Sequence, residues 1–103
     1  MSNKALDRLA SAVRNVPDFP KPGIQFKDIT PVLSDPELLK LAIEEMTKPF
    51  RDLKVDKVVG VDARGFIFGA LVSSTLGCGF VPARKAGKLP LKTRKATYDL
   101  EYG

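Results

Sequence analysis

Residues 58–70 read VVGVDARGFIFGA, and this stretch decides the fold because its apolar run breaks at Arg64-Gly65 and then resumes with helical spacing. The first half predicts a buried strand and the second half predicts a helix. The polar residues between them form the loop that follows the strand. In an open α/β sheet ligands bind at this edge, where a helix N-terminus offers unpaired N–H groups to an anion.

Arg64 has two interpretations at this position. It binds a phosphate or pyrophosphate at the helix start, or it caps the edge of the sheet or pairs with Asp62, as polar residues of short βα loops do. The local pattern favours neither.

The segments on either side of this loop predict one βαβ unit. Residues 55–61 form the first strand, residues 65–76 a helix closed by Gly77, and residues 80–83 the second strand. Pro82 has no N–H to donate, which places the second strand at an edge or its pairing beyond this proline. The pattern therefore predicts an α/β protein.

Upstream, helices alternate with extended segments. Ser2 caps a first helix that ends near Asn15, and three prolines with a glycine in residues 16–23 predict an ordered loop or arm. Residues 24–29 alternate apolar and polar side chains, as a half-buried strand does.

A second helix begins within residues 34–37, where Ser34 is the capping residue and Pro36 stands in the first turn. Pro49 ends this helix. Its core-facing stripe consists of Leu39, Ala42, Ile43, Met46 and Phe50.

Composition excludes several classes of protein. The chain of 103 residues is 44% apolar and 28% charged. It has neither an apolar run of ~18 residues nor a charged leader, so we expect one cytoplasmic domain with no membrane partner. Because it has one cysteine, Cys78, and no histidine, internal disulfides, zinc clusters and histidine bases are excluded. Cys78 is interpreted as a small buried residue.

Positive charge is concentrated at the C-terminal end. The net charge is +5, of which residues 80–103 carry +4, with six Lys and Arg against two acids. Such a field favours an acidic ligand, either a nucleotide phosphate or nucleic acid, and a solvated charged loop is the alternative. Residues 84–95 predict a surface loop, and residues 97–102 show a strand-like alternation.

The common nucleotide motifs are absent, since the chain has neither Gly-x-Gly-x-x-Gly nor a Walker Gly-Lys-Ser/Thr loop. Several other short motifs follow one another in an order that closely resembles the adenine phosphoribosyltransferase family of type I phosphoribosyltransferases. They cover nearly the whole chain and are residues 18–24 (DFPKPGI), 26–33 (FKDITPVL), 62–65 (DARG), 84–90 (RKAGKLP) and 98–103 (YDLEYG).

This resemblance implies a fold and a reaction. The fold is α/β, an incomplete phosphoribosyltransferase-type parallel sheet with flanking helices and an N-terminal hood. Residues 1–33 form the helix, arm and hood, and residues 34–103 the truncated core and the start of the lid, within a single domain. The reaction, part of purine salvage, forms AMP and pyrophosphate from adenine and phosphoribosyl pyrophosphate. The resemblance also implies a homodimer, no nucleic-acid partner, and Mg²⁺ bound through phosphoribosyl pyrophosphate and by no residue identified in the chain.

The resemblance further assigns roles to residues. Gln25, Phe26 and Lys27 form the hood, with Phe26 stacked on adenine. Arg64 holds pyrophosphate oxygens and is catalytic together with Glu101, the carboxylate that handles the purine proton. The remaining substrate-binding residues are Arg84, Lys85 and Lys88, which add positive charge near pyrophosphate, partly across a dimer interface, and Tyr102, which lies beside Glu101 on the lid.

Physical chemistry agrees with these roles. A purine is a flat π-surface that an aromatic ring can cover, and arginine presents a planar fork suited to phosphate oxygens. From the local pattern alone, Phe26 is instead a core strand residue and Glu101 a solvated carboxylate.

One feature of the family is missing. Residues 1–103 contain no pair of acids followed by a Thr-Gly-Gly loop, the family's signature for the ribose and its 5-phosphate. The chain therefore resembles the N-terminal part of the enzyme, and we expect no catalysis by this stretch alone. Two other hypotheses are a non-enzymatic basic module that binds nucleotide or RNA phosphates through residues 84–95, and a structural subunit that pairs its sheet edge with another chain.

Overall fold

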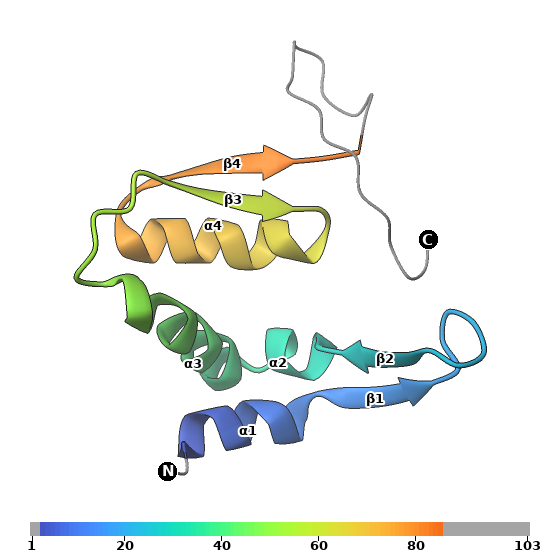
Figure 1. Cartoon of the computed structure of the whole chain (residues 1–103). Helices are drawn as coiled ribbons and strands as arrows, with labels where there is room; N and C mark the ends of the chain where they lie inside the picture. The colour runs from blue at the N-terminus through green and yellow to red at the C-terminus, as the bar shows by residue number, and fades with distance from the viewer. Residues whose placement is uncertain (1–2, 86–103) are drawn as a thin grey trace. The chain divides into compact units, whose positions relative to one another are not determined.

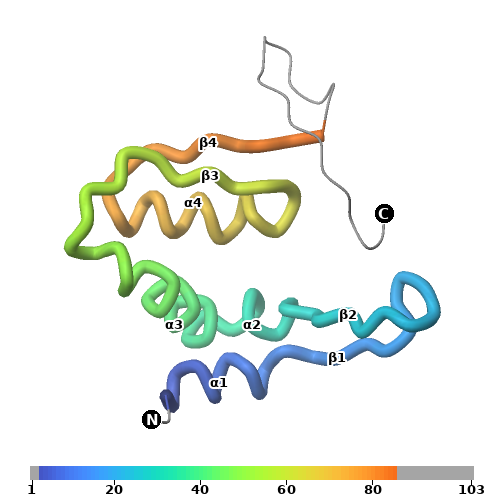
Figure 2. The backbone as a smooth tube through the Cα atoms, viewed as in Figure 1, coloured from blue at the N-terminus to red at the C-terminus, as the bar shows by residue number. Residues whose placement is uncertain are grey.

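The computed structural model describes residues 3–85 of the chain, which divides into two compact units, Met1–Lys54 and Val55–Gly103 (Figures 1 and 2). The single domain that the sequence predicts, with its division after residue 33, stays a prediction. Within the described residues, no helix has the length and apolar character needed to cross a membrane.

The first unit combines helices with an antiparallel hairpin. Its elements are α1 (Lys4–Ala12), β1 (Arg14–Pro17), β2 (Gln25–Asp28), α2 (Thr30–Ser34), α3 (Pro36–Thr47) and the 3-10 turn η1 (Lys48–Phe50). In the hairpin, Arg14 lies opposite Asp28 and Pro17 opposite Gln25. The core of this unit contains Val32 of α2 and Ala42, Ile43 and Thr47 of α3, which are buried.

Both predicted helix caps are wrong by one residue. α1 is capped by Asn3 and not by Ser2, because the Asn3 side-chain oxygen accepts from the N–H groups of Ala5 and Leu6. α3 is capped in the same way by Asp35. Ser34 cannot serve this purpose because it belongs to α2, a short helix that the sequence pattern did not indicate.

The predicted end of the first helix is also wrong. α1 ends at Ala12 instead of near Asn15, because Val13 is already extended, with a ψ of 126°. From Arg14 onward the chain pairs with β2, so its backbone hydrogen bonds go to a strand rather than to the preceding helical turn. The end of α3 before Pro49 is confirmed.

The second unit is the predicted βαβ unit, which is confirmed. Its elements are β3 (Lys57–Val61), α4 (Arg64–Leu76) and β4 (Gly79–Ala83). The strands are parallel, with Val61 opposite Ala83 at their carboxyl ends. α4 ends at Gly77, whose φ of +76° is a conformation that glycine adopts without steric cost. Pro82 lies within β4, opposite Gly60, and among the described strands β4 pairs with β3 alone.

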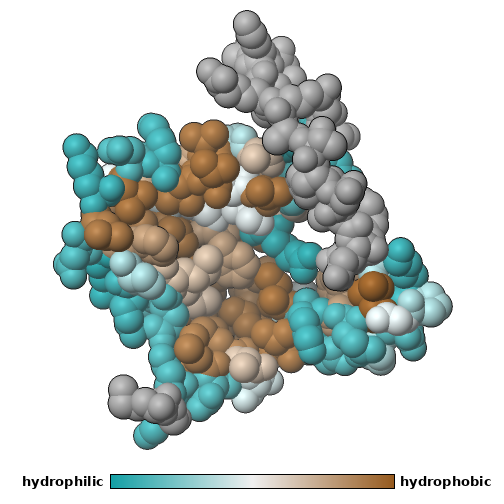
Figure 3. Space-filling model, viewed as in Figure 1, coloured by the Kyte–Doolittle hydropathy of each residue, from teal (hydrophilic) through white to brown (hydrophobic). Residues whose placement is uncertain are grey.

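The burial predicted for the first strand is only partly correct. Gly60 is buried, but Val59 and Val61 are 63% and 52% exposed. Val81 of β4, which lies opposite Val59, is 43% exposed. The strands therefore have an apolar surface that no described residue covers, and Figure 3 shows brown, apolar side chains over this part of the molecule.

Candidate functional site

The loop between β3 and α4 consists of Asp62 and Ala63, and α4 begins at Arg64. Within the described residues no side chain caps this helix start. Arg64 is exposed and is the first residue of this helix, whose first turn has N–H groups that favour an anion. The helix that starts directly after the strand and its short loop is thus confirmed, and the binding of a phosphate or pyrophosphate there stays a prediction.

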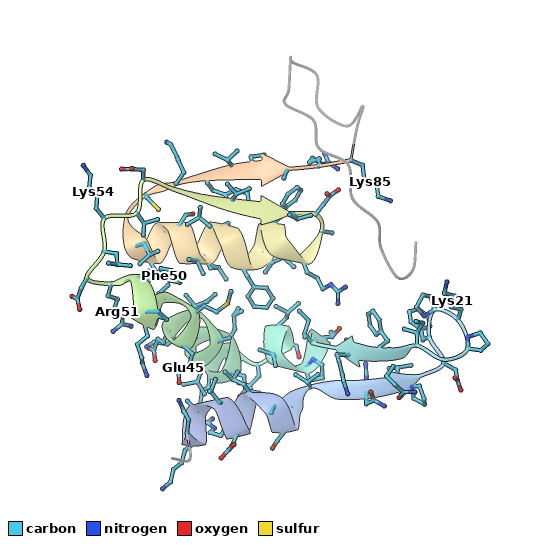
Figure 4. All side chains as sticks on the ribbon, viewed as in Figure 1. Lys21, Glu45, Phe50, Arg51, Lys54 and Lys85 are labelled. Carbon is cyan, nitrogen blue, oxygen red and sulfur yellow. The ribbon has the colours of Figure 1, made fainter. Side chains whose placement is uncertain are left out.

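The end of β4 lies beside the same loop. The Asp62 N–H donates to the Ala83 carbonyl oxygen at 3.2 Å, which joins the two strand ends. Arg84 follows directly, and its Nε lies 3.7 Å from Oδ2 of Asp62. Lys85 is the next residue and lies just beyond the end of β4 (Figure 4). The fold thus brings Arg64, Arg84 and Lys85 to one edge of the sheet, as expected for residues that follow paired parallel strands.

Glycines allow β3 and α4 to approach closely behind this loop. A Cβ on Gly60 would lie 2.4 Å from the carbonyl oxygen of Gly65 and 2.6 Å from the ring of Phe80. A Cβ on Gly69 would lie 2.3 Å from the same ring. Side chains larger than glycine therefore do not fit at either position without a shift of the neighbouring atoms. A glycine inside a strand pattern is the sequence signal that could have indicated this contact.

Phe66 is a residue near the site that sequence reasoning missed. Its ring meets Phe80 edge-on, with centroids 6.0 Å apart and planes at 83°. The guanidinium carbon of Arg84 lies 5.7 Å from the centroid of Phe66. An arginine above an aromatic face is attracted by the quadrupole of the ring.

The predicted hood corresponds to the hairpin of the first unit and its loop. Phe26 of β2 contacts Phe19 edge-on, with ring centroids 5.1 Å apart, and Phe19 is 51% exposed. The loop is closed by a hydrogen bond from the Phe19 N–H to the Ile24 oxygen and by one from the Gly23 N–H to Asp18 Oδ1. Lys21 lies at the tip of this loop (Figure 4). The closed loop therefore holds Phe19 against Phe26 of β2, and such aromatic side chains are suited to contact a flat ring.

Gln25 and Lys27 flank Phe26 and both contact Asn15 of β1. Asn15 Nδ2 donates to Gln25 Oε1 at 2.9 Å, and Lys27 Nζ donates to Asn15 Oδ1 at 2.8 Å. Since side chains alternate along a strand, Gln25 and Lys27 lie on the face of the hairpin opposite Phe26. Their side chains therefore brace the hairpin, and the aromatic ring is on the other face.

Asp28, at the end of β2, is a second residue that the sequence reasoning missed. Its Oδ1 accepts from Thr30 N–H and Thr30 Oγ1, and its Oδ2 accepts from Arg14 Nε at 2.9 Å. The hydrogen bonds from Thr30, followed by that from Arg14, lower the pKa of Asp28 from 3.8 to about 2. The carboxylate thereby joins β1 and the start of α2 to the end of the hood. The Asp-x-Thr spacing before a helix could have indicated this turn.

Lys88, Glu101 and Tyr102 lie outside the described residues, so their predicted roles stay predictions. The assignments of Gln25, Phe26 and Lys27 to adenine, and of Arg64, Arg84 and Lys85 to pyrophosphate, are likewise predictions, because no ligand is bound.

Comparison with known proteins first shows which class of fold this chain has. No protein-family model matches the chain. The fold is nevertheless that of type I phosphoribosyltransferases, of which the chain covers part. The solved adenine phosphoribosyltransferase of Rhodothermus marinus is 58% identical with a TM-score of 0.88, and the similarity covers 97% of this chain and 57% of that one.

The particular relatives are adenine phosphoribosyltransferases. That of Nitrosococcus oceani is 53% identical over 98 residues, which is 95% of this chain and 57% of the relative. The Saccharomyces cerevisiae enzyme, solved with D-2,5-dideoxy-2,5-imino-altritol 1,6-bisphosphate and adenine, is 41% identical, with a TM-score of 0.87, over 97% of this chain and 59% of that one. The predicted resemblance is therefore confirmed, and the chain spans a little over half the length of these relatives.

Proposed function

We propose that this chain forms the adenine- and pyrophosphate-handling part of an adenine phosphoribosyltransferase. The observation that carries the proposal is the 41–58% identity to such enzymes over almost the whole chain. In the proposed reaction, N9 of adenine forms a bond to C1 of the ribose as the bond from C1 to pyrophosphate breaks. Pyrophosphate leaves with the electron pair, and the N9 proton is lost.

The hood supplies the base-binding surface in this proposal. Phe26 covers one face of adenine, and its edge contact with Phe19 holds the ring in place. Because Gln25 and Lys27 brace the opposite face of the hairpin through Asn15, we assign the reading of the base edge to the backbone of this segment.

The basic edge of the βαβ unit supplies the charge that the leaving pyrophosphate requires. Arg64 and the uncapped start of α4 contact its oxygens, and Arg84 and Lys85 raise the local positive potential. Lys88 adds to this charge in the proposal, and Glu101 accepts the purine proton with Tyr102 beside it. Charge aimed at the leaving group stabilises the transition state more than the ground state, because negative charge develops there as the bond breaks.

Mg²⁺ is proposed to bind through the phosphate oxygens of the substrate, where it would neutralise negative charge. In residues 3–85 no group of three or more His, Cys, Asp or Glu side chains is placed to hold a metal ion, so a cage made only of protein ligands is not proposed there. A homodimer in the cytoplasm, with Arg84 and its neighbours partly at the dimer interface, completes the proposal.

A chimera tests the proposal. Residues 1–103 are joined to the segment of the Rhodothermus marinus enzyme that follows the aligned region, and AMP formation from labelled adenine and phosphoribosyl pyrophosphate is measured with Mg²⁺. We expect activity comparable to that of the parent enzyme, and its loss in the chimera with Arg64→Ala. A folded, dimeric chimera that binds AMP but forms none from these substrates would overturn the proposal.

A further inference from the structure

A continuous series of aromatic contacts lies beneath Arg84. Phe80 fills the space that Gly60 and Gly69 leave open, and Phe66 rests edge-on against Phe80. The guanidinium of Arg84 lies over Phe66. Each member of the series is thus supported by the one before it, starting from a close contact between β3 and α4.

We propose that Phe66 is a positioning residue, which holds the guanidinium plane of Arg84 at the edge of the sheet so that it can bind pyrophosphate oxygens. The inference rests on the proposed function, since it concerns the same anion. Phe66 itself contacts no substrate in this proposal and acts through Arg84.

The geometry supports this role because Asp62 and Phe66 contact different parts of the Arg84 guanidinium group. Asp62 approaches Arg84 at Nε, at 3.7 Å, and Phe66 lies under the plane. A cation–π contact uses none of the N–H donors. The Nη end of the fork is therefore the part suited to the paired oxygens of a phosphate.

The physical benefit is a smaller loss of side-chain freedom on binding. An unsupported arginine side chain loses much of its rotamer entropy when it binds an anion, whereas one held by a ring and a carboxylate has already lost part of it. Removal of the ring should therefore weaken anion binding only while Arg84 is present. A purely structural role of Phe66 would weaken binding equally with and without Arg84.

A double-mutant cycle in the 103-residue chain tests this difference, with pyrophosphate as the ligand and calorimetry as the measurement. We expect Phe66→Leu to raise the Kd by about threefold to tenfold in the wild-type background and by less than about twofold in the Arg84→Ala background. Phe66→Tyr keeps the ring and should restore affinity to within about twofold of wild type. Equal losses in the two backgrounds would overturn the inference and leave the proposed function intact.

NMR supplies a second measurement that does not depend on pyrophosphate. The Arg84 side-chain protons should be shifted upfield by the Phe66 ring, and the shift should be retained in Phe66→Tyr and lost in Phe66→Leu. If Phe66→Leu does not fold, nuclear Overhauser contacts between the Phe66 ring and Arg84 in the wild-type chain test whether the two side chains are in contact. Absence of both signals would overturn the inference. A wild-type chain that binds no pyrophosphate would overturn the proposed anion site as well.

Discussion

Replacement of Gly60 by alanine should destabilise the βαβ unit, because the added Cβ has no room. It would lie 2.4 Å from the carbonyl oxygen of Gly65, a backbone atom that cannot rotate away, and 2.6 Å from the ring of Phe80. Overpacking of this kind costs about 1–3 kcal/mol. Replacing a glycine inside a strand by alanine also stabilises the folded state by about 0.5–1 kcal/mol, because the unfolded chain then has less conformational entropy to lose. The difference between these ranges is about 0–2.5 kcal/mol, and because the closest clash is with a backbone atom we expect its upper part, a net decrease of about 1–2.5 kcal/mol in the free energy of unfolding.

Gly79→Ala is the matched control, since Gly79 is in the neighbouring strand. Its nearest atom to an added Cβ is Lys57 Nζ at 3.0 Å, the end of a flexible side chain that can move. This variant should be as stable as wild type or slightly more stable. Urea unfolding followed by circular dichroism compares the two. Equal stability of Gly60→Ala and Gly79→Ala would refute the reasoning.

A third variant separates the two clashes at Gly60. In a Phe80→Leu background the ring is gone but the Gly65 carbonyl oxygen remains. The cost of Gly60→Ala should therefore persist in large part. Complete rescue would show that the ring alone, and not the approach of β3 to α4, requires glycine at this position.

Four further outcomes are expected. Arg64→Ala should weaken pyrophosphate binding by about 1.5–3 kcal/mol, measured by calorimetry with the exposed Arg51→Ala as control, and an unchanged Kd in Arg64→Ala would contradict the assignment. Phe26→Ala in the chimera should raise KM for adenine much more than KM for phosphoribosyl pyrophosphate, because stacking involves only the base; equal changes would point to a folding defect. Asp28, with a pKa lowered from 3.8 to about 2, should stabilise the first unit fully above about pH 4, and this contribution should be lost as the pH falls through 2. The stability difference between wild type and Asp28→Asn should shrink over that range, and a constant difference would argue against it. The 103-residue chain alone should form no AMP in a radiolabel assay, since it has no paired acids before a Gly-rich loop, and AMP formation would show that the reaction does not need them.

Local patterns were sufficient to predict the βαβ unit. The apolar run, the helical spacing after Arg64 and the glycine after Leu76 each act within a few residues, and all three agree. The strand β1 was missed for the opposite reason. Arg14–Pro17 has no strong strand pattern of its own, and it is extended because it pairs with β2, a partner that appears only after the proline-rich loop.

The candidate site, too, could be predicted from the sequence only in part. That Arg64 and Arg84 approach one edge follows from topology, because residues after two paired parallel strands must lie near each other, and the register of Val61 with Ala83 makes Asp62 and Arg84 neighbours. The position of Phe66 beneath Arg84 does not follow from topology. It depends on whether Phe80 can enter between β3 and α4, which two glycines on different elements, Gly60 of β3 and Gly69 of α4, allow only together. The loop sequences thus determine which charged residues stand at the site, whereas the packing of neighbouring residues determines how the Arg84 side chain is oriented. Substitutions at Gly60 or Gly69 should therefore disturb anion binding without removing any charge.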